Sequence, residues 1–170
     1  WVAHYRAQEN KRKDALFHDH LAARLVGDRG RKISDAMAKI SRYTEWSVIS
    51  RTVLIDRFIQ GLLKEGIDTV LNLGAGLDTR PYRMNLPASL QWIEADQPSI
   101  IKHKNAVLQN ESPRCQLRRV AIDLANSTER KKVLDDVATQ SKKVLVITEG
   151  VIPYLSPDQV FGSSNVHQAA

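Results

Sequence analysis

An apolar segment runs directly into a glycine-rich turn at Thr69-Val-Leu-Asn-Leu-Gly-Ala-Gly-Leu-Asp-Thr-Arg80. The first five residues have the apolar, β-branched composition of a short strand, which predicts a strand over residues 69–73 that ends at Gly74. Gly74 and Gly76 allow a tight turn and a close approach of backbone N–H groups to a ligand. Thr79 occupies the position of the third glycine of a dinucleotide-binding fingerprint. The pattern alone therefore indicates a tight turn as readily as a nucleotide site.

Three further apolar segments follow, separated by helical stretches. Residues 90–93, 117–122 and 144–148 predict strands, and residues 99–109 and 127–140 predict helices. Strands that alternate with helices are typical of a parallel sheet with right-handed crossovers, which predicts an α/β fold. Ligands bind such sheets beyond the carboxyl ends of the strands, so the residues after each strand are the candidate site.

The chain before this sheet has helical patterning. Residues 14–26 predict a helix that stops at Gly27, and residues 28–32 predict a basic loop. Two further helices are predicted at 34–40 and 47–65.

The last of these helices carries a charge on its apolar stripe. Val48, Ile55, Phe58 and Leu62 recur at helical spacing, and Arg51 lies on the same stripe. A charge on a buried face needs a partner. We therefore expect Arg51 to reach the rim, to pair with a carboxylate, or to bind an anionic ligand.

The composition fits one ordinary domain of 170 residues, with 42% hydrophobic and 26% charged residues. We expect a helical segment over 1–66 and an α/β half over 67–170. No apolar run approaches the roughly 20 residues that span a bilayer, which excludes a transmembrane protein. The single cysteine, Cys115, excludes a disulfide scaffold and favours a reducing compartment, so we expect a cytoplasmic protein. The net charge is +6, but the basic residues are scattered and no aromatics interleave them, so we expect no nucleic-acid partner.

Carboxylates follow the second strand. Glu94 and Asp96 lie eighteen and twenty residues after Gly76, an offset at which an acidic residue can bind the hydroxyls of an adenosine ribose. The alternative is that both merely cap the helix that starts near Pro98.

The third and fourth strands also end in acidic residues. Asp123 and Leu124 could hold an adenine, although Asp123 alone would also suit a helix cap or a loop. Glu149, next to Gly150, could face a cationic ligand group or simply stand exposed at a strand end.

Acidic strand ends favour a particular class of ligand. The pyrophosphate of a dinucleotide is anionic and would prefer fewer carboxylates nearby, whereas a sulfonium, an ammonium and a ribose would prefer more. S-adenosylmethionine carries these three groups together with a carboxylate that needs a cation. Arg51 is the candidate for that cation.

Three motifs in order resemble those of one family. They are Asn72-Leu-Gly-Ala-Gly-Leu-Asp-Thr-Arg-Pro-Tyr-Arg83, Glu94-Ala-Asp-Gln-Pro98 and Thr148-Glu-Gly-Val-Ile-Pro-Tyr-Leu155. The chain resembles the leucine carboxyl methyltransferase family of S-adenosylmethionine-dependent O-methyltransferases, from Arg6 to about Val160. The resemblance implies a Rossmann-like class I methyltransferase sheet of about four parallel strands, preceded by helices.

The resemblance also implies roles for individual residues. Arg51 would grip the cofactor carboxylate, Gly74 would contact its methionine portion, and Glu149 would hold its amino end. Asp96 would hold the ribose, and Asp123 with Leu124 the adenine. Gly76 belongs to the same turn as Gly74. Arg6 is the candidate for a basic cofactor contact near the start of the chain, while His20 stands where the family pattern has a proline.

We expect the acceptor to be a carboxylate or hydroxyl of a small molecule or peptide. An ionised carboxylate needs no general base, and the sequence nominates no catalytic residue and no metal site. Family members continue with further strands, so we expect this chain to lack the C-terminal strands and to leave its fourth strand as an exposed edge. The alternatives are a catalytically incompetent cofactor-binding remnant or partner-binding fragment, and a nicotinamide-dependent oxidoreductase.

Overall fold

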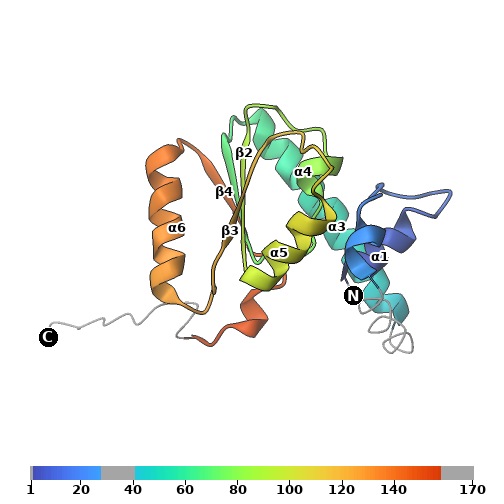
Figure 1. Cartoon of the computed structure of the whole chain (residues 1–170). Helices are drawn as coiled ribbons and strands as arrows, with labels where there is room; N and C mark the ends of the chain where they lie inside the picture. Colours follow the sequence, from blue (N-terminus) through green and yellow to red (C-terminus); the bar gives the residue numbers. More distant parts are fainter. Residues whose placement is uncertain (1, 28–40, 158–170) are drawn as a thin grey trace, which may run out of the picture.

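The computed structural model of this chain describes residues 2–27 and 41–157 (Figure 1). Four parallel strands form one sheet in the order β3-β2-β1-β4. They are β1 (Thr69–Leu73), β2 (Gln91–Asp96), β3 (Gln116–Ala121) and β4 (Val144–Ile147). The predicted α/β fold and its four parallel strands are confirmed. The boundaries of β1 match the prediction, and those of the other strands differ from it by at most three residues.

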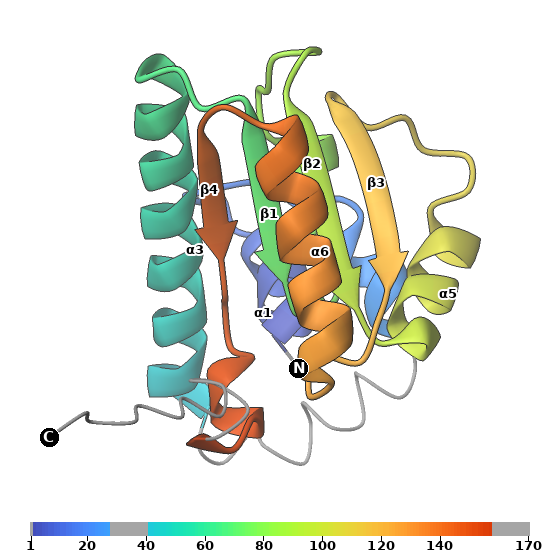
Figure 2. The same ribbon diagram turned by 90° about the vertical axis from the view of Figure 1, so that its left-hand side faces the viewer.

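The helices lie on both faces of this sheet (Figures 1 and 2). One face carries α6 (Ser127–Gln140), and the other carries α3 (Ser41–Lys64), α4 (Arg80–Arg83) and α5 (Pro98–Val107). Right-handed crossovers explain the arrangement, because the chain adds β2 and β3 on one side of β1 and then returns to add β4 on the other side. The strand order therefore reverses between β1 and β4. The glycine turn lies just beyond the carboxyl end of β1, next to this point of reversal.

Two apolar cores flank the sheet, and β1 contributes to both. Val70 and Trp92 are completely buried against α3, while Leu71 and Ile93 point to the α6 face. Cys115 belongs to the α3-side core, where burial, and then the charge of Glu94, raise the pKa of its thiol to about 11.

Local capping fixes several boundaries that the sequence predicts. Helix α6 spans the predicted residues, and the side chain of Asn126 accepts hydrogen bonds from the backbone N–H groups of Thr128 and Glu129 at its start. Helix α3 ends before Gly66, whose φ of +84° suits a glycine after a helix.

The N-terminal prediction is wrong over residues 14–21. Helix α1 (Val2–Glu9) packs against α3, and the chain then runs through turns until a helix starts at residue 22. The Glu9 carboxylate accepts the backbone N–H of Leu16 at 2.7 Å, and the Asp19 carboxylate accepts that of Ala22 at 3.0 Å. In a continuous helix the N–H of Ala22 would have bonded to the carbonyl of residue 18, but here Asp19 accepts it, and Leu16 is exposed.

The stripe on α3 is only partly correct. The helix starts six residues before the predicted position, and its buried positions include Val48 and Ile59. Phe58, predicted to lie on the apolar stripe, is 60% exposed and lines an open cavity together with Leu145 and Val146 of the edge strand β4. The predicted loop at 28–32 and helix at 34–40 lie outside the described residues.

Strand β4 is an edge strand, as expected. Within the described part of the chain it pairs with β1 alone, and Val146 is nearly half exposed. In those same ranges, no helix combines the length and the apolar character needed to cross a membrane.

Candidate functional site

The site forms where the loops after β1, β2, β3 and β4 meet. Gly74 has a φ of +70° and donates its N–H to the Ala95 carbonyl at 2.8 Å, which joins the ends of β1 and β2. A Cβ on Gly74 would lie 2.7 Å from the Cβ of Val151, in the loop after β4. Backbone conformation and close contact therefore both require glycine at position 74.

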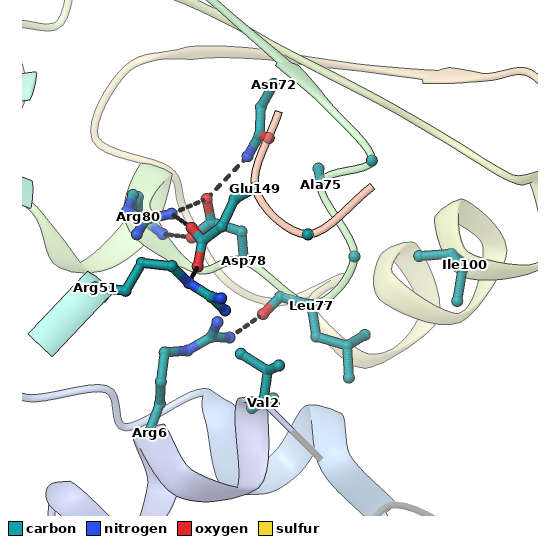
Figure 3. Close-up of a pocket in the computed structure, with 14 residues that line it drawn as sticks. Val2, Arg6, Arg51, Asn72, Ala75, Leu77, Asp78, Arg80, Ile100 and Glu149 are labelled. Carbon is teal, nitrogen blue, oxygen red and sulfur yellow. Dashed lines mark hydrogen bonds and ion pairs between the residues drawn. The ribbon is translucent and has the colours of Figure 1, made fainter. Parts of the chain in front are cut away.

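Two cavities adjoin at this turn and share Gly74 and Gly150. The larger has a volume of about 470 Å³ and lies between α1, α3 and the glycine turn (Figure 3). The smaller has a volume of about 250 Å³ and lies over the ends of β2 and β3. All eight predicted site residues line one or both. Arg6, Arg51, Gly76 and Glu149 line the larger cavity, Asp96, Asp123 and Leu124 line the smaller one, and Gly74 lines both.

Arg51 forms an ion pair at the wall of the larger cavity. Its Nε donates to Glu149 Oε1 at 2.9 Å, and the side chain is 39% exposed. Within residues 2–27 and 41–157, neither terminal nitrogen of Arg51 has a hydrogen-bond partner. The pairing with a carboxylate and the orientation into a cavity thus occur together.

A second arginine holds the other oxygen of Glu149. Arg80, 2% exposed, donates to Glu149 Oε2 and to Asp78 Oδ2, both at 3.0 Å, and to Asp56 Oδ1 at 2.7 Å. It therefore ties together α3, the glycine turn and the end of β4. Arg80 and Asp78 are site residues that the sequence does not predict, and their position directly after the two glycines of the turn is the one signal for them in the sequence.

The pKa values of Asp78 and Arg80 are both shifted in the direction that keeps the side chain charged. Burial raises the pKa of the Asp78 carboxyl, but the positive charges of Arg80 and Arg6 outweigh burial and hold it well below its ordinary value. Burial lowers the pKa of Arg80, and the surrounding carboxylates, Asp78 and Glu149 foremost, raise it above its ordinary value. Both groups are therefore ionised at neutral pH.

Arg6 enters the larger cavity from α1 and points toward Arg51 (Figure 3). Its Nε donates to Asp19 Oδ2 at 3.0 Å, and its Nη2 donates to the Leu77 carbonyl in the glycine turn. The side chain is almost fully buried. Two guanidinium groups in one cavity suit an anionic ligand group.

The structure separates the two carboxylates at the end of β2. Asp96 lines the smaller cavity and accepts the backbone N–H groups of Gly76 and Gln97 at 2.6 and 2.7 Å. Glu94 is completely buried elsewhere, in ion pairs with Lys104 and Arg119 at 2.8 Å each. Only Asp96 is therefore placed to meet a ligand.

The end of β3 supplies an exposed carboxylate and a buried apolar side chain. Asp123 is exposed and accepts the backbone N–H of Ala125 at 2.9 Å, while Leu124 is 7% exposed. The cap of α6 is Asn126, not Asp123. Asp123 thus both stabilises the loop after β3 and lines the smaller cavity.

One further polar atom near the site has no partner in the described region. Asn72, at the end of β1, donates through Nδ2 to Asp78 at 2.9 Å, but its buried Oδ1 accepts no hydrogen bond there. Also within the described residues, no cluster of three or more histidine, cysteine, aspartate or glutamate side chains is arranged to hold a metal ion.

Comparison with known proteins agrees with this arrangement. The sequence profile of the family described as leucine carboxyl methyltransferase matches residues 1–162. The chain belongs to the leucine carboxyl methyltransferase family. The predicted resemblance is thereby confirmed.

Individual relatives are described as methyltransferases. A protein of Mycobacteroides abscessus, named "Putative S-adenosyl-L-methionine-dependent methyltransferase", is 30% identical over 186 residues, which cover 99% of this chain and 61% of that protein. Relatives with the same description in Streptomyces avermitilis and Parafrankia are 33% and 31% identical over 94% of this chain, and 59% and 53% of their own lengths are covered. The chain therefore spans a little over half the length of these relatives.

The donor set fits the cofactor named in those relatives. The larger cavity offers cations for a carboxylate and Glu149 for an ammonium, and the smaller one offers an acceptor beside an apolar wall. A carboxylate provides about four acceptor sites, and each oxygen of Asp96 uses one of them to accept a backbone N–H. The remaining acceptor sites are available for hydroxyls.

Proposed function

We propose that this chain forms the cofactor-binding part of an S-adenosylmethionine-dependent O-methyltransferase. One observation carries the proposal: two cavities meet at Gly74, one lined by Arg6, Arg51 and Glu149 and the other by Asp96 and Leu124. A cofactor with a zwitterionic end and an adenosine end needs two such compartments in contact.

Each residue has a stated task in this proposal. Arg6 and Arg51 hold the carboxylate of the cofactor, and Glu149 holds its ammonium group. Asp96 accepts the ribose hydroxyls, while Asp123 and Leu124 hold the adenine through its amino group and its ring. Gly74 and Gly76 let the backbone approach the ligand.

The chemistry follows from these positions. S-adenosylmethionine, when bound, supplies a methyl group on a positively charged sulfur. The chain's residues orient it, and positioning of this kind contributes roughly 7–11 kcal/mol to lowering a barrier. Among the described residues, neither cavity is lined by a histidine. A carboxylate acceptor is already ionised at neutral pH and needs no general base, so the proposed function requires no histidine in these cavities.

A thermal unfolding experiment tests the proposal. At one hundred times its dissociation constant, a ligand adds about 2.7 kcal/mol to the free energy of unfolding. S-adenosylmethionine or S-adenosylhomocysteine should raise the melting temperature, and NADH should not. A shift with NADH alone would show that the cavities take a dinucleotide.

A second measurement separates the enzyme from a cofactor-binding remnant. The chain covers 53–61% of three of its relatives, so binding without transfer is a specific alternative. Labelled methyl groups should appear on members of a carboxylate panel if this chain is active by itself. Cofactor binding with no transfer to any acceptor would favour the remnant.

A further inference from the structure

A buried carboxylate outside both cavities joins three parts of the molecule. Asp19 lies in the turns before the helix at residues 22–27 and is 1% exposed. Its Oδ2 accepts hydrogen bonds from Arg6 Nε at 3.0 Å and from Thr79 Oγ1 at 2.7 Å, and its Oδ1 accepts the backbone N–H of Ala22 at 3.0 Å. Asp19 therefore connects α1, the helix at 22–27 and the glycine turn.

The contact with Thr79 explains an anomaly in the sequence. Thr79 stands where a dinucleotide-binding turn has its third glycine, and it is completely buried. Its hydroxyl donates to Asp19 instead of making room for a close helix–strand contact. Thr79 therefore joins the glycine turn to the N-terminal segment.

The contact with Arg6 fixes the direction of that guanidinium. Asp19 holds Nε, and the Leu77 carbonyl holds Nη2, so two of the three nitrogens are fixed by the protein. Nη1 has no partner in the described part of the chain, and Arg6 lines the larger cavity. Across residues 2–27 and 41–157, Asp19 is the one carboxylate that forms an ion pair with Arg6.

We infer that Asp19 is a positioning residue that presents Arg6 to the carboxylate end of the cofactor. The inference rests on the proposed function and adds a residue that touches no ligand. A side chain held before binding loses less conformational freedom when the ligand arrives. Without Asp19, Arg6 would share the cavity with Arg51 and Arg80 and lack its own counter-charge.

Two ligands distinguish positioning from general structural support. S-adenosylhomocysteine carries the amino-acid end that Arg6 would bind, and 5′-methylthioadenosine has the adenosine portion without that end. Asp19→Asn should weaken S-adenosylhomocysteine about tenfold, as expected for loss of a charge-assisted contact, and leave 5′-methylthioadenosine unchanged. Isothermal titration calorimetry measures both affinities on the full chain.

Two further variants sharpen the test. Asp14→Asn removes an exposed carboxylate that pairs with Arg12 in the same segment, and it should change neither affinity. In an Arg6→Met background, Asp19→Asn should have no further effect on S-adenosylhomocysteine, because the residue through which it acts is gone. If Asp19→Asn does not fold, Asp19→Glu keeps the charge but displaces the carboxylate, and the same selective loss is expected.

The outcomes are distinct. Equal loss of both ligands, no loss of either, or a full effect of Asp19→Asn in the Arg6→Met background would overturn the positioning role. A wild-type chain that binds neither ligand would instead overturn the proposed function. Selective loss of S-adenosylhomocysteine alone supports the inference.

Discussion

Replacing Gly74 with alanine tests whether contact as well as backbone conformation requires glycine at the centre of the site. Its φ of +70° is unfavourable for any residue with a Cβ, at a cost of roughly 1–2 kcal/mol. The new methyl group would also lie 2.7 Å from Val151 Cβ and 2.8 Å from its Cγ2, and overpacking of this kind costs about 1–3 kcal/mol. The two effects together predict a loss of about 2–5 kcal/mol in the free energy of unfolding.

The chain supplies a matched control for the backbone effect. Gly66 has a similar φ of +84°, but a Cβ there would meet nothing within 4 Å. Gly66→Ala should therefore cost only the conformational part, about 1–2 kcal/mol. Urea denaturation followed by circular dichroism gives both values from the shift in midpoint and the slope.

A double variant isolates the contact itself. Val151→Gly removes the three atoms nearest to the new methyl group, so Gly74→Ala should cost about 1–3 kcal/mol less in that background than in the wild type. If Gly74→Ala and Gly66→Ala cost the same, and Val151→Gly gives no rescue, the reasoning from close contact is refuted.

Three further predictions follow from the charged groups. Asp96→Asn should weaken S-adenosylhomocysteine at least tenfold in a calorimetric titration, because a charge-assisted acceptor is lost, and unchanged affinity would remove its ribose role. Glu94→Gln should lower the free energy of unfolding, measured by urea denaturation, by about 3–5 kcal/mol, because Lys104 and Arg119 would lose their buried partner. A loss below about 1 kcal/mol would show that these two ion pairs do not stabilise the fold. The lowered pKa of Asp78 means that its contribution to stability is present above its unfolded pKa of about 3.9 and is lost as the pH falls further, through the native value. The free energy of unfolding, measured from pH 2 to pH 6, should therefore fall less steeply below about pH 4 for Asp78→Asn than for the wild type. The same pH dependence in both proteins would show that the ion pair contributes nothing to stability.

The sheet could be predicted because its signals are local. Each strand is a short apolar run, and the crossover rule turns four such runs and their helices into one topology. Helix α6 was predicted to the residue, since polar capping and turn residues flank a clear periodic segment. The grouping of Asp96 and Glu149 around two adjoining cavities follows from the same topology, because parallel strands end at one edge, whereas Arg51 reaches the site from helix α3.

The N-terminal segment could not be predicted in this way. The apolar spacing of residues 14–26 is helical, but the Glu9 and Asp19 carboxylates capture backbone N–H groups across turns. Asp19 in turn is fixed by Arg6 and by Thr79, which lies sixty residues further along the chain. A periodic pattern contains no information about such distant partners.

The sequence leaves three interpretations of Arg51 open, and the structure shows that two of them, pairing with a carboxylate and facing a cavity, are compatible. A guanidinium has three nitrogens, and Glu149 engages only Nε. The pairing neutralises the charge in a partly buried position, which lowers the cost of holding a cation there. The remaining two nitrogens of Arg51 lie toward the guanidinium group of Arg6, which lines the same cavity. Arg80 holds the second oxygen of Glu149, and Arg51 contacts the carboxylate through Nε alone. The acidic strand end and the arginine on the apolar stripe thus form one ion pair. In the proposed function, this ion pair leaves part of each partner available for a zwitterionic ligand.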